Sequence, residues 1–246
     1  MLNFYRITLC FLLSVLATLN VYAAPNPRSI ELNEKAVAAV KANDFKSAEK
    51  LFKSALASDS GNLTAAFNLA GMYLTNQKFS QAINLLQQYT DANPKDAGLW
   101  SRLGDAYFSN KEIAKAISSY KQSLALDGNN LEATKRLATV YSLTNDSKNA
   151  EILLRKAHSL DPRDAQTAAN LSSLLLVNEK PDEAVTYAKR AIQLSPSKEV
   201  YITLGTAYEI LKDYKNALIA FERAQDLGDN SKALTSKIDD LKKVTS

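Results

Sequence analysis

Residues 97–130 read AGLWSRLGDAYFSNKEIAKAISSYKQSLALDGNN, and the pattern of this stretch returns along most of the chain. Alanine marks the period most clearly. Six alanines follow one another at intervals of 34, 34, 34, 34 and 33 residues: Ala48, Ala82, Ala116, Ala150, Ala184 and Ala217. A fixed period of this length indicates one supersecondary unit that is stacked repeatedly. The sequence therefore predicts a solenoid, an architecture that commonly holds other proteins.

Apolar residues within each unit form two stripes with helical spacing. With Ser29 as position 1, positions 4, 7, 8 and 11 form one stripe, and positions 20, 24, 27 and 28 form the other. Each unit is therefore predicted to be two antiparallel helices, A and B, that must stack on a neighbour to bury both stripes. The predicted units are 29–62, 63–96, 97–130, 131–164, 165–197 and 198–230. A further apolar stripe within 231–246 predicts a C-terminal capping helix.

These positions resemble the tetratricopeptide repeat family over residues 29–230. The third unit carries the family pattern as Trp100, Leu103-Gly104, Tyr107, Ala116 and Tyr120. The fourth unit repeats much of it as Leu137-Ala138, Tyr141, Ala150, Ala157 and Pro162. The resemblance implies an all-α, right-handed superhelical solenoid of six antiparallel helix pairs, with a concave groove lined by the A helices.

The N-terminal residues differ in composition from the repeats. Arg6 precedes a mostly apolar run over 7–17, and Val21-Tyr22-Ala23 provides a cleavage site, so residues 1–23 are predicted to be a secretory signal peptide. Residues 24–28 would then be a short flexible leader. The alternative is an uncleaved anchor, although the apolar run is short for a membrane span of about 20 residues. The expected location is periplasmic or secreted, or the inner membrane if the anchor stays.

The composition argues against several function classes. Cys10, the only cysteine, lies in the predicted signal peptide, and lipid attachment there is an alternative that its flanking residues do not favour. His158 is the only histidine and occupies a packing position, so neither a zinc site nor catalysis by His or Cys is expected. The net charge of +4 comes from interspersed residues without a basic stripe, which argues against nucleic acid as a partner. No enzyme activity and no cofactor are predicted.

The resemblance places candidate binding residues on helix A, through positions 2, 5, 6, 9, 12 and 13 of the family. Phe67 and Phe108 would be partly exposed anchors for a peptide or helix. Arg102, Lys135 and Arg136 could bind a carboxylate of the partner. The candidate groove residues are Phe67, Asn68, Arg102, Asp105, Phe108, Lys135, Arg136 and Asn170.

The expected function is a non-enzymatic scaffold of the cell envelope that binds a peptide or helix of a partner protein in this groove. The alternative is a membrane-tethered assembly factor for a pilus, secretion or polysaccharide-export complex, held by an uncleaved N-terminus. Only in that alternative would the chain contact a membrane. The identity of the partner and the oligomeric state do not follow from the sequence.

Overall fold

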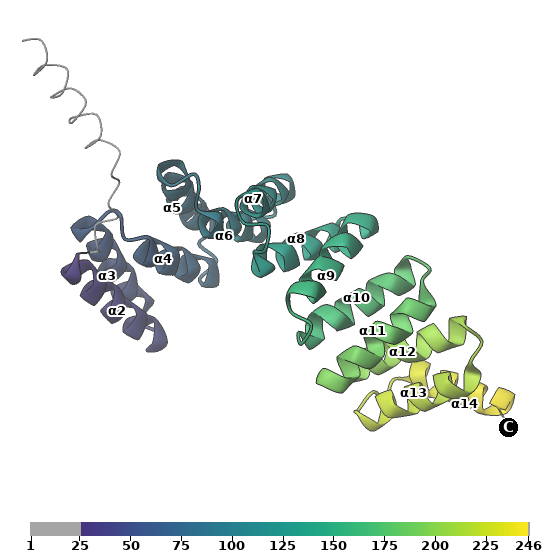
Figure 1. Cartoon of the computed structure of the whole chain (residues 1–246). Helices are drawn as coiled ribbons and strands as arrows, with labels where there is room; N and C mark the ends of the chain where they lie inside the picture. The colour runs from purple at the N-terminus through teal and green to yellow at the C-terminus, as the bar shows by residue number, and fades with distance from the viewer. Residues whose placement is uncertain (1–25, 246) are drawn as a thin grey trace, which may run out of the picture. The chain divides into compact units, whose positions relative to one another are not determined.

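The computed structural model describes residues 26–245, and these form thirteen α-helices without a strand (Figure 1). The predicted signal peptide, 1–23, lies outside the described residues. Two compact units divide between Met72 and Tyr73, inside one helix. The predicted all-α class and the predicted helix pairs are confirmed. None of the helices in 26–245 combines the length and the apolar content that a membrane span needs.

Helices A and B alternate along the chain. The A helices are α2 (Pro27–Lys41), α4 (Leu63–Thr75), α6 (Ala97–Ser109), α8 (Leu131–Leu143), α10 (Ala165–Val177), α12 (Lys198–Ile210) and α14 (Lys232–Thr245). The B helices are α3 (Phe45–Ser58), α5 (Phe79–Ala92), α7 (Ile113–Leu126), α9 (Ser147–Leu160), α11 (Pro181–Leu194) and α13 (Tyr214–Asp226). From α5 onward each helix packs on the next one in the chain. Two pairs of A helices from consecutive repeats also contact each other, α6 with α8 and α10 with α12.

The first helix begins earlier than the sequence suggested. Pro27 and Arg28 were expected in the flexible leader, but both belong to α2. Proline is favoured in the first turn of a helix, where its missing N–H costs no hydrogen bond. The side chain of Asn26 caps this turn by accepting a 2.9 Å hydrogen bond from the Arg28 backbone N–H.

The turn between helices A and B is the same in all six repeats. Position 15 of each repeat has a left-handed backbone, with φ between 57° and 64°, at Asn43, Gln77, Lys111, Asn145, Glu179 and Lys212. The N–H of position 16 donates to the carbonyl of position 11, as in Glu112 to Tyr107, and the N–H of position 15 donates to position 12, as in Lys111 to Phe108. This is the Schellman motif, and it occurs here without glycine. The absence of glycine at position 15 leaves the motif without its usual sequence signal.

The turn between helix B and the next helix A is closed by side-chain caps. Asn62, Asp96, Asn130, Asp164 and Ser197 precede successive A helices, and each accepts a hydrogen bond from a backbone N–H in the first turn. Ser231 does the same for α14. The last helix therefore starts in the same way as the A helices before it.

The helix pairs are held together by small residues against large ones. The six periodic alanines are all fully buried, which confirms them as packing residues. In the third repeat, the ring of Tyr120 lies so close to Gly104 that a Cβ on the glycine would be 2.6 Å from Cε1 of the ring. Gly205 and Phe221 repeat this arrangement in the sixth repeat, again at 2.6 Å. The helices thus approach each other closely at positions 8 and 24 in these two repeats.

Position 25 of one repeat contacts the tyrosine at position 11 of the next. Gln87 Nε2 donates to the Tyr107 hydroxyl at 2.8 Å. Lys121 lies over the Tyr141 ring, 5.8 Å from its centroid, and Lys189 lies over the Tyr208 ring at 5.5 Å. These contacts help to fix the second repeat on the third, the third on the fourth and the fifth on the sixth.

Glu151 links the fourth repeat to the fifth through hydrogen bonds of its side chain. Only 8% of this residue is exposed. Its carboxylate accepts hydrogen bonds from Lys180 Nζ at 2.8 Å, from Asn178 Nδ2 at 2.6 Å and from Arg155 Nε at 2.9 Å. Burial opposes ionisation of Glu151, but the hydrogen bonds from these three side chains outweigh it and lower its pKa to about 2.

Candidate protein-interaction surface

Three of the predicted groove residues, Arg102, Asp105 and Arg136, come together in one charged cluster on α6 and α8. Asp105 accepts a 2.8 Å hydrogen bond from the Tyr120 hydroxyl. Arg136 Nε lies 3.5 Å from Asp105 Oδ1, and an Arg102 terminal nitrogen lies 3.7 Å from Oδ2. Arg136 also pairs with Glu132 at 2.8 Å. The two arginines therefore have carboxylate partners within the chain.

Burial governs the charge of Asp105. Burial raises the pKa of this carboxyl, and the Tyr120 hydroxyl and the two arginines only partly offset the effect. The pKa of Tyr120 is raised as well, first because the side chain is buried and then because an ionised hydroxyl would face the Asp105 carboxylate. Asp105 thus supports the helix pair from within and is a poor candidate for direct contact with a partner.

Lys135 and Asn170 also have partners within the chain. Lys135 Nζ donates to Asp164 Oδ2 at 2.6 Å, and Asp164 caps α10. Burial would raise the pKa of Asp164, but hydrogen bonds from Lys135 and Thr167 outweigh it and lower the pKa to about 2. Asn170 Oδ1 accepts a 2.7 Å hydrogen bond from Gln166 Nε2. Lys135 therefore serves to link α8 to the start of α10.

The remaining candidates lie on two different A helices. Phe108 is partly buried on α6, and Phe67 is partly buried on α4. Asn68 Nδ2 donates to Asn33 Oδ1 at 3.0 Å, which joins α4 to α2. Phe67 and Asn68 belong to the unit that ends at Met72, and the other six candidates belong to the unit that starts at Tyr73.

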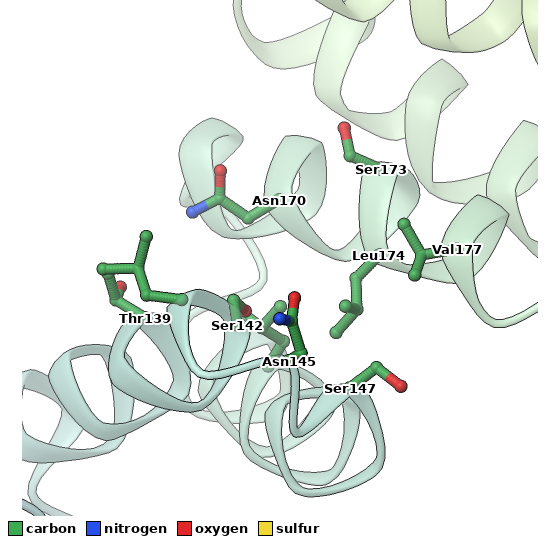
Figure 2. A pocket seen from close by; sticks show the side chains of 10 residues that line it. Thr139, Ser142, Asn145, Ser147, Asn170, Ser173, Leu174 and Val177 are labelled. Atoms are coloured by element: carbon green, nitrogen blue, oxygen red, sulfur yellow. The ribbon is translucent and has the colours of Figure 1, made fainter.

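A cavity of about 460 Å³ lies between α8 and α10, and ten side chains line it (Figure 2). Thr139, Ser142, Leu143, Asn145, Ser147 and Leu154 come from α8, the turn after it and α9, and Asn170, Ser173, Leu174 and Val177 come from α10. Figure 2 shows the Asn145 amide extending into the space between the two helices. The lining is made of hydroxyl, amide and aliphatic groups, and none of its ten residues carries a charge.

Sequence reasoning missed the exposed aliphatic residues beside this cavity. Leu143 is 66% exposed and Val177 is 71% exposed, and each is the last residue of its A helix. The equivalent residue of α12, Ile210, is 55% exposed. Position 13 reads Lys41, Thr75, Ser109, Leu143, Val177 and Ile210 along the repeats. This change from polar to apolar is the signal that could have identified them.

His158 has a structural environment. Its ring packs edge-on against Tyr187, with the centroids 5.2 Å apart, and its buried Nδ1 has no hydrogen-bond partner among residues 26–245. Within residues 26–245, no three His, Cys, Asp or Glu side chains are placed so that they could hold a metal ion together.

The chain belongs to the tetratricopeptide repeat family. Models of this repeat match residues 39–106, 97–130 and 169–232, which together cover most of the predicted array. The periodic alanines, the helix pairs and the glycine–aromatic contacts are thus the features of a known repeat.

Curated relatives share only a part of their length with this chain. Anaphase-promoting complex subunit 3 of Schizosaccharomyces pombe is 26% identical over 148 residues, which are 60% of this chain and 22% of that protein. Heat shock protein STI1 of Saccharomyces cerevisiae is 30% identical over 122 residues, which are 49% of this chain and 20% of that protein. The chain therefore spans about a fifth of the length of these two relatives.

Solved structures with the same fold cover more of the chain. Pseudomonas aeruginosa pilF has a TM-score of 0.71 at 13% identity, and the match covers 87% of this chain and 96% of the pilF chain. YrrB, described as a TPR protein with an unusual peptide-binding site, has a TM-score of 0.67 at 17% identity and covers 75% of this chain and 96% of its own. At these identities the likeness shows the tetratricopeptide repeat fold.

Proposed function

We propose that this chain is a non-enzymatic scaffold of the cell envelope that binds a peptide or helix of a partner protein on the surface of its A helices. The observation that carries the proposal is the cavity of about 460 Å³ between α8 and α10. A pocket that combines aliphatic side chains with a few polar groups is a typical binding site. YrrB, with the same fold, is described as having a peptide-binding site, which supports this kind of partner.

The non-enzymatic role rests on the residues that are present. The only histidine is packed against Tyr187. The most perturbed carboxylates are occupied by ion pairs, Glu151 with Lys180 of the next repeat and Asp164, at the start of α10, with Lys135. The repeats thus use their titratable groups for architecture. A catalytic site would need such groups to be available to a substrate.

The envelope location rests on the sequence of residues 1–23, which has the order of regions typical of a secretory signal peptide. The chain would then act outside the cytoplasm after cleavage behind Ala23. In the alternative, the uncleaved segment tethers an assembly factor for a pilus, secretion or polysaccharide-export complex. The intact mass of the protein recovered from the envelope fraction separates the two, because only the cleaved form lacks these 23 residues.

The binding role can be tested with the full chain as bait in an envelope extract. The bait should recover a defined partner, and a variant with Thr139, Asn170 and Ser173 of the cavity wall replaced by alanine should recover less of it. Circular dichroism must show that the variant is folded, because Asn170 also accepts a hydrogen bond from Gln166. Equal recovery by the folded variant would rule out these three residues as contacts, and recovery of no partner by either bait would contradict the scaffold role.

A further inference from the structure

Four exposed aliphatic residues occupy the same place on four A helices. Leu143, Val177, Ile210 and Val244 are each the thirteenth residue of their helix, in α8, α10, α12 and α14. They are 66%, 71%, 55% and 66% exposed. Ser231 caps α14 as Ser197 caps α12, so that Val244 is the structural equivalent of Ile210. These four residues are the aliphatic row.

The fold does not require aliphatic residues at this position. In the first three repeats the equivalent residues are Lys41, Thr75 and Ser109, and the turn that follows them has the same Schellman geometry. Single exposed aliphatic residues are ordinary, but a periodic set on adjacent helices is unusual for a monomer surface. The stability of the turn therefore does not explain why these four residues are aliphatic.

We propose that the aliphatic row and the cavity between α8 and α10 form the contact site for a partner segment with uncharged aliphatic side chains. This inference rests on the proposed function and narrows its partner. Leu143 and Val177 line the cavity, so that the row and the cavity are continuous at α8 and α10. An aliphatic side chain that enters the cavity would contact Leu143, Leu154, Leu174 and Val177.

The charges near the site favour an uncharged segment. None of the ten residues that line the cavity is charged. The neighbouring cations Lys135, Arg136 and Lys237 pair with Asp164, Glu132 and Glu209 at 2.6, 2.8 and 2.5 Å. A charged side chain in the cavity would lose its hydration without gaining a counter-charge, which is costly. The amides of Asn145 and Asn170 can instead hydrogen-bond the peptide groups of the segment.

The area of the row argues against a second copy of this chain as the occupant. Four partly exposed aliphatic side chains present a patch of a few hundred Å². A stable protein–protein interface buries roughly 800 Å² on each partner. A short segment that enters the cavity can use the patch fully, because it contacts the row and the cavity walls at once.

The test uses the full chain as target for a phage-displayed library of random 12-residue peptides. Enriched peptides are synthesised, and their affinity is measured by fluorescence polarisation for the natural chain and for two double variants. Leu143→Ser with Val177→Ser removes half of the row. Ile152→Ser with Ile219→Ser is the matched control, because these residues are 57% and 50% exposed on helices α9 and α13.

The proposal expects enriched peptides with uncharged aliphatic residues that bind the row variant at least about tenfold more weakly, since two apolar contacts are lost. The control variant should bind within about twofold of the natural chain. Peptides that bind the row variant and the natural chain equally would overturn the inference and leave the proposed function standing. If the library yields no binding peptide at all, the proposed function fails as well.

Discussion

The Tyr120 hydroxyl, on helix B of the third repeat, donates a 2.8 Å hydrogen bond to Asp105 on helix A of the same repeat. Tyr120 is fully buried, so this bond connects the interior of the helix pair to the charged cluster with Arg102 and Arg136. Asp105 is therefore part of the architecture, and removal of its hydrogen bond from Tyr120 should affect stability.

Replacement of Tyr120 by phenylalanine should lower the free energy of unfolding by about 1 kcal/mol, because the partly buried Asp105 carboxyl loses a hydrogen bond. Urea denaturation followed by circular dichroism measures the change. Tyr141→Phe is the matched control, because the structure gives the Tyr141 hydroxyl no hydrogen-bond partner within residues 26–245. An equal effect of the two substitutions would contradict the assigned role of the Tyr120 hydroxyl.

Gly104 and Gly71 should respond to alanine with opposite signs. A Cβ on Gly104 would lie 2.6 Å from the Tyr120 ring, so Gly104→Ala should destabilise the chain by about 1–3 kcal/mol through overpacking. A Cβ on Gly71 would meet no atom of the described part of the chain, residues 26–245, within 4 Å, so Gly71→Ala should stabilise its helix by roughly 0.5–1 kcal/mol. Thermal unfolding of both variants measures this, and a stabilising Gly104→Ala would show that the helix pair is not closely packed there.

Acidic pH should weaken the contacts of Glu151 that link the fourth and fifth repeats. The pKa of Glu151 falls from its ordinary value of 4.5 to about 2 on folding. A carboxyl with a lowered pKa in the folded state stabilises above its unfolded pKa, and this stability is lost as the pH falls toward its folded pKa. The free energy of unfolding should therefore decrease from about pH 4.5 to pH 2.

Glu151→Gln tests this assignment. The variant should be less stable at pH 7 by about 1–3 kcal/mol, since a buried carboxylate with charged partners is lost. Its free energy of unfolding should also decrease less between pH 4.5 and pH 2. Some decrease remains, because the pKa of Asp164 is lowered to about 2 as well. If the free energy of unfolding decreased equally in both proteins between pH 4.5 and pH 2, Glu151 would not be the residue that links the two repeats.

The left-handed residues of the A–B turns offer a way to stabilise the array. Lys111 has a φ of 64°, a conformation that asparagine tolerates better than lysine. Lys111→Asn should raise the free energy of unfolding by about 0.5 kcal/mol. Asn145→Ala at the equivalent position, with a φ of 59°, should lower it by about 1 kcal/mol. Urea denaturation measures the free energy of unfolding of both variants. A lower value for Lys111→Asn than for the natural chain would contradict the turn geometry.

The sequence predicted those parts of the fold that depend on periodicity. The alanines at position 20 and the two helical stripes identified the helix pairs, because burial of a small residue is required in every repeat. The A–B turns left no such signal, since the left-handed position is occupied by Gln77, Lys111, Glu179 and Lys212 as well as by asparagine. The Schellman motif was therefore visible only in the backbone.

The contacts that the candidate residues make within the chain could be predicted only in part, for a physical reason. Arg102, Lys135 and Arg136 were expected to bind a carboxylate of the partner, but each pairs with a carboxylate of the chain. Arg102–Asp105 and Arg136–Glu132 lie within one helix at i,i+3 and i,i+4, a spacing that the sequence does show. The Lys135–Asp164 pair depends on how α8 meets the start of α10, which the spacing along the sequence does not show. The aliphatic row, in contrast, could have been found from position 13 alone.

The most direct measurement for the account is site-specific photo-crosslinking of the natural chain in the cells that produce it. A benzophenone amino acid is placed at Val177, in the aliphatic row, and in a second strain at Ile152, an exposed aliphatic residue of α9. If the aliphatic row contacts the partner, position 177 should give a crosslinked partner protein and position 152 none. A partner captured only from position 152, or no adduct from position 177, would contradict that contact.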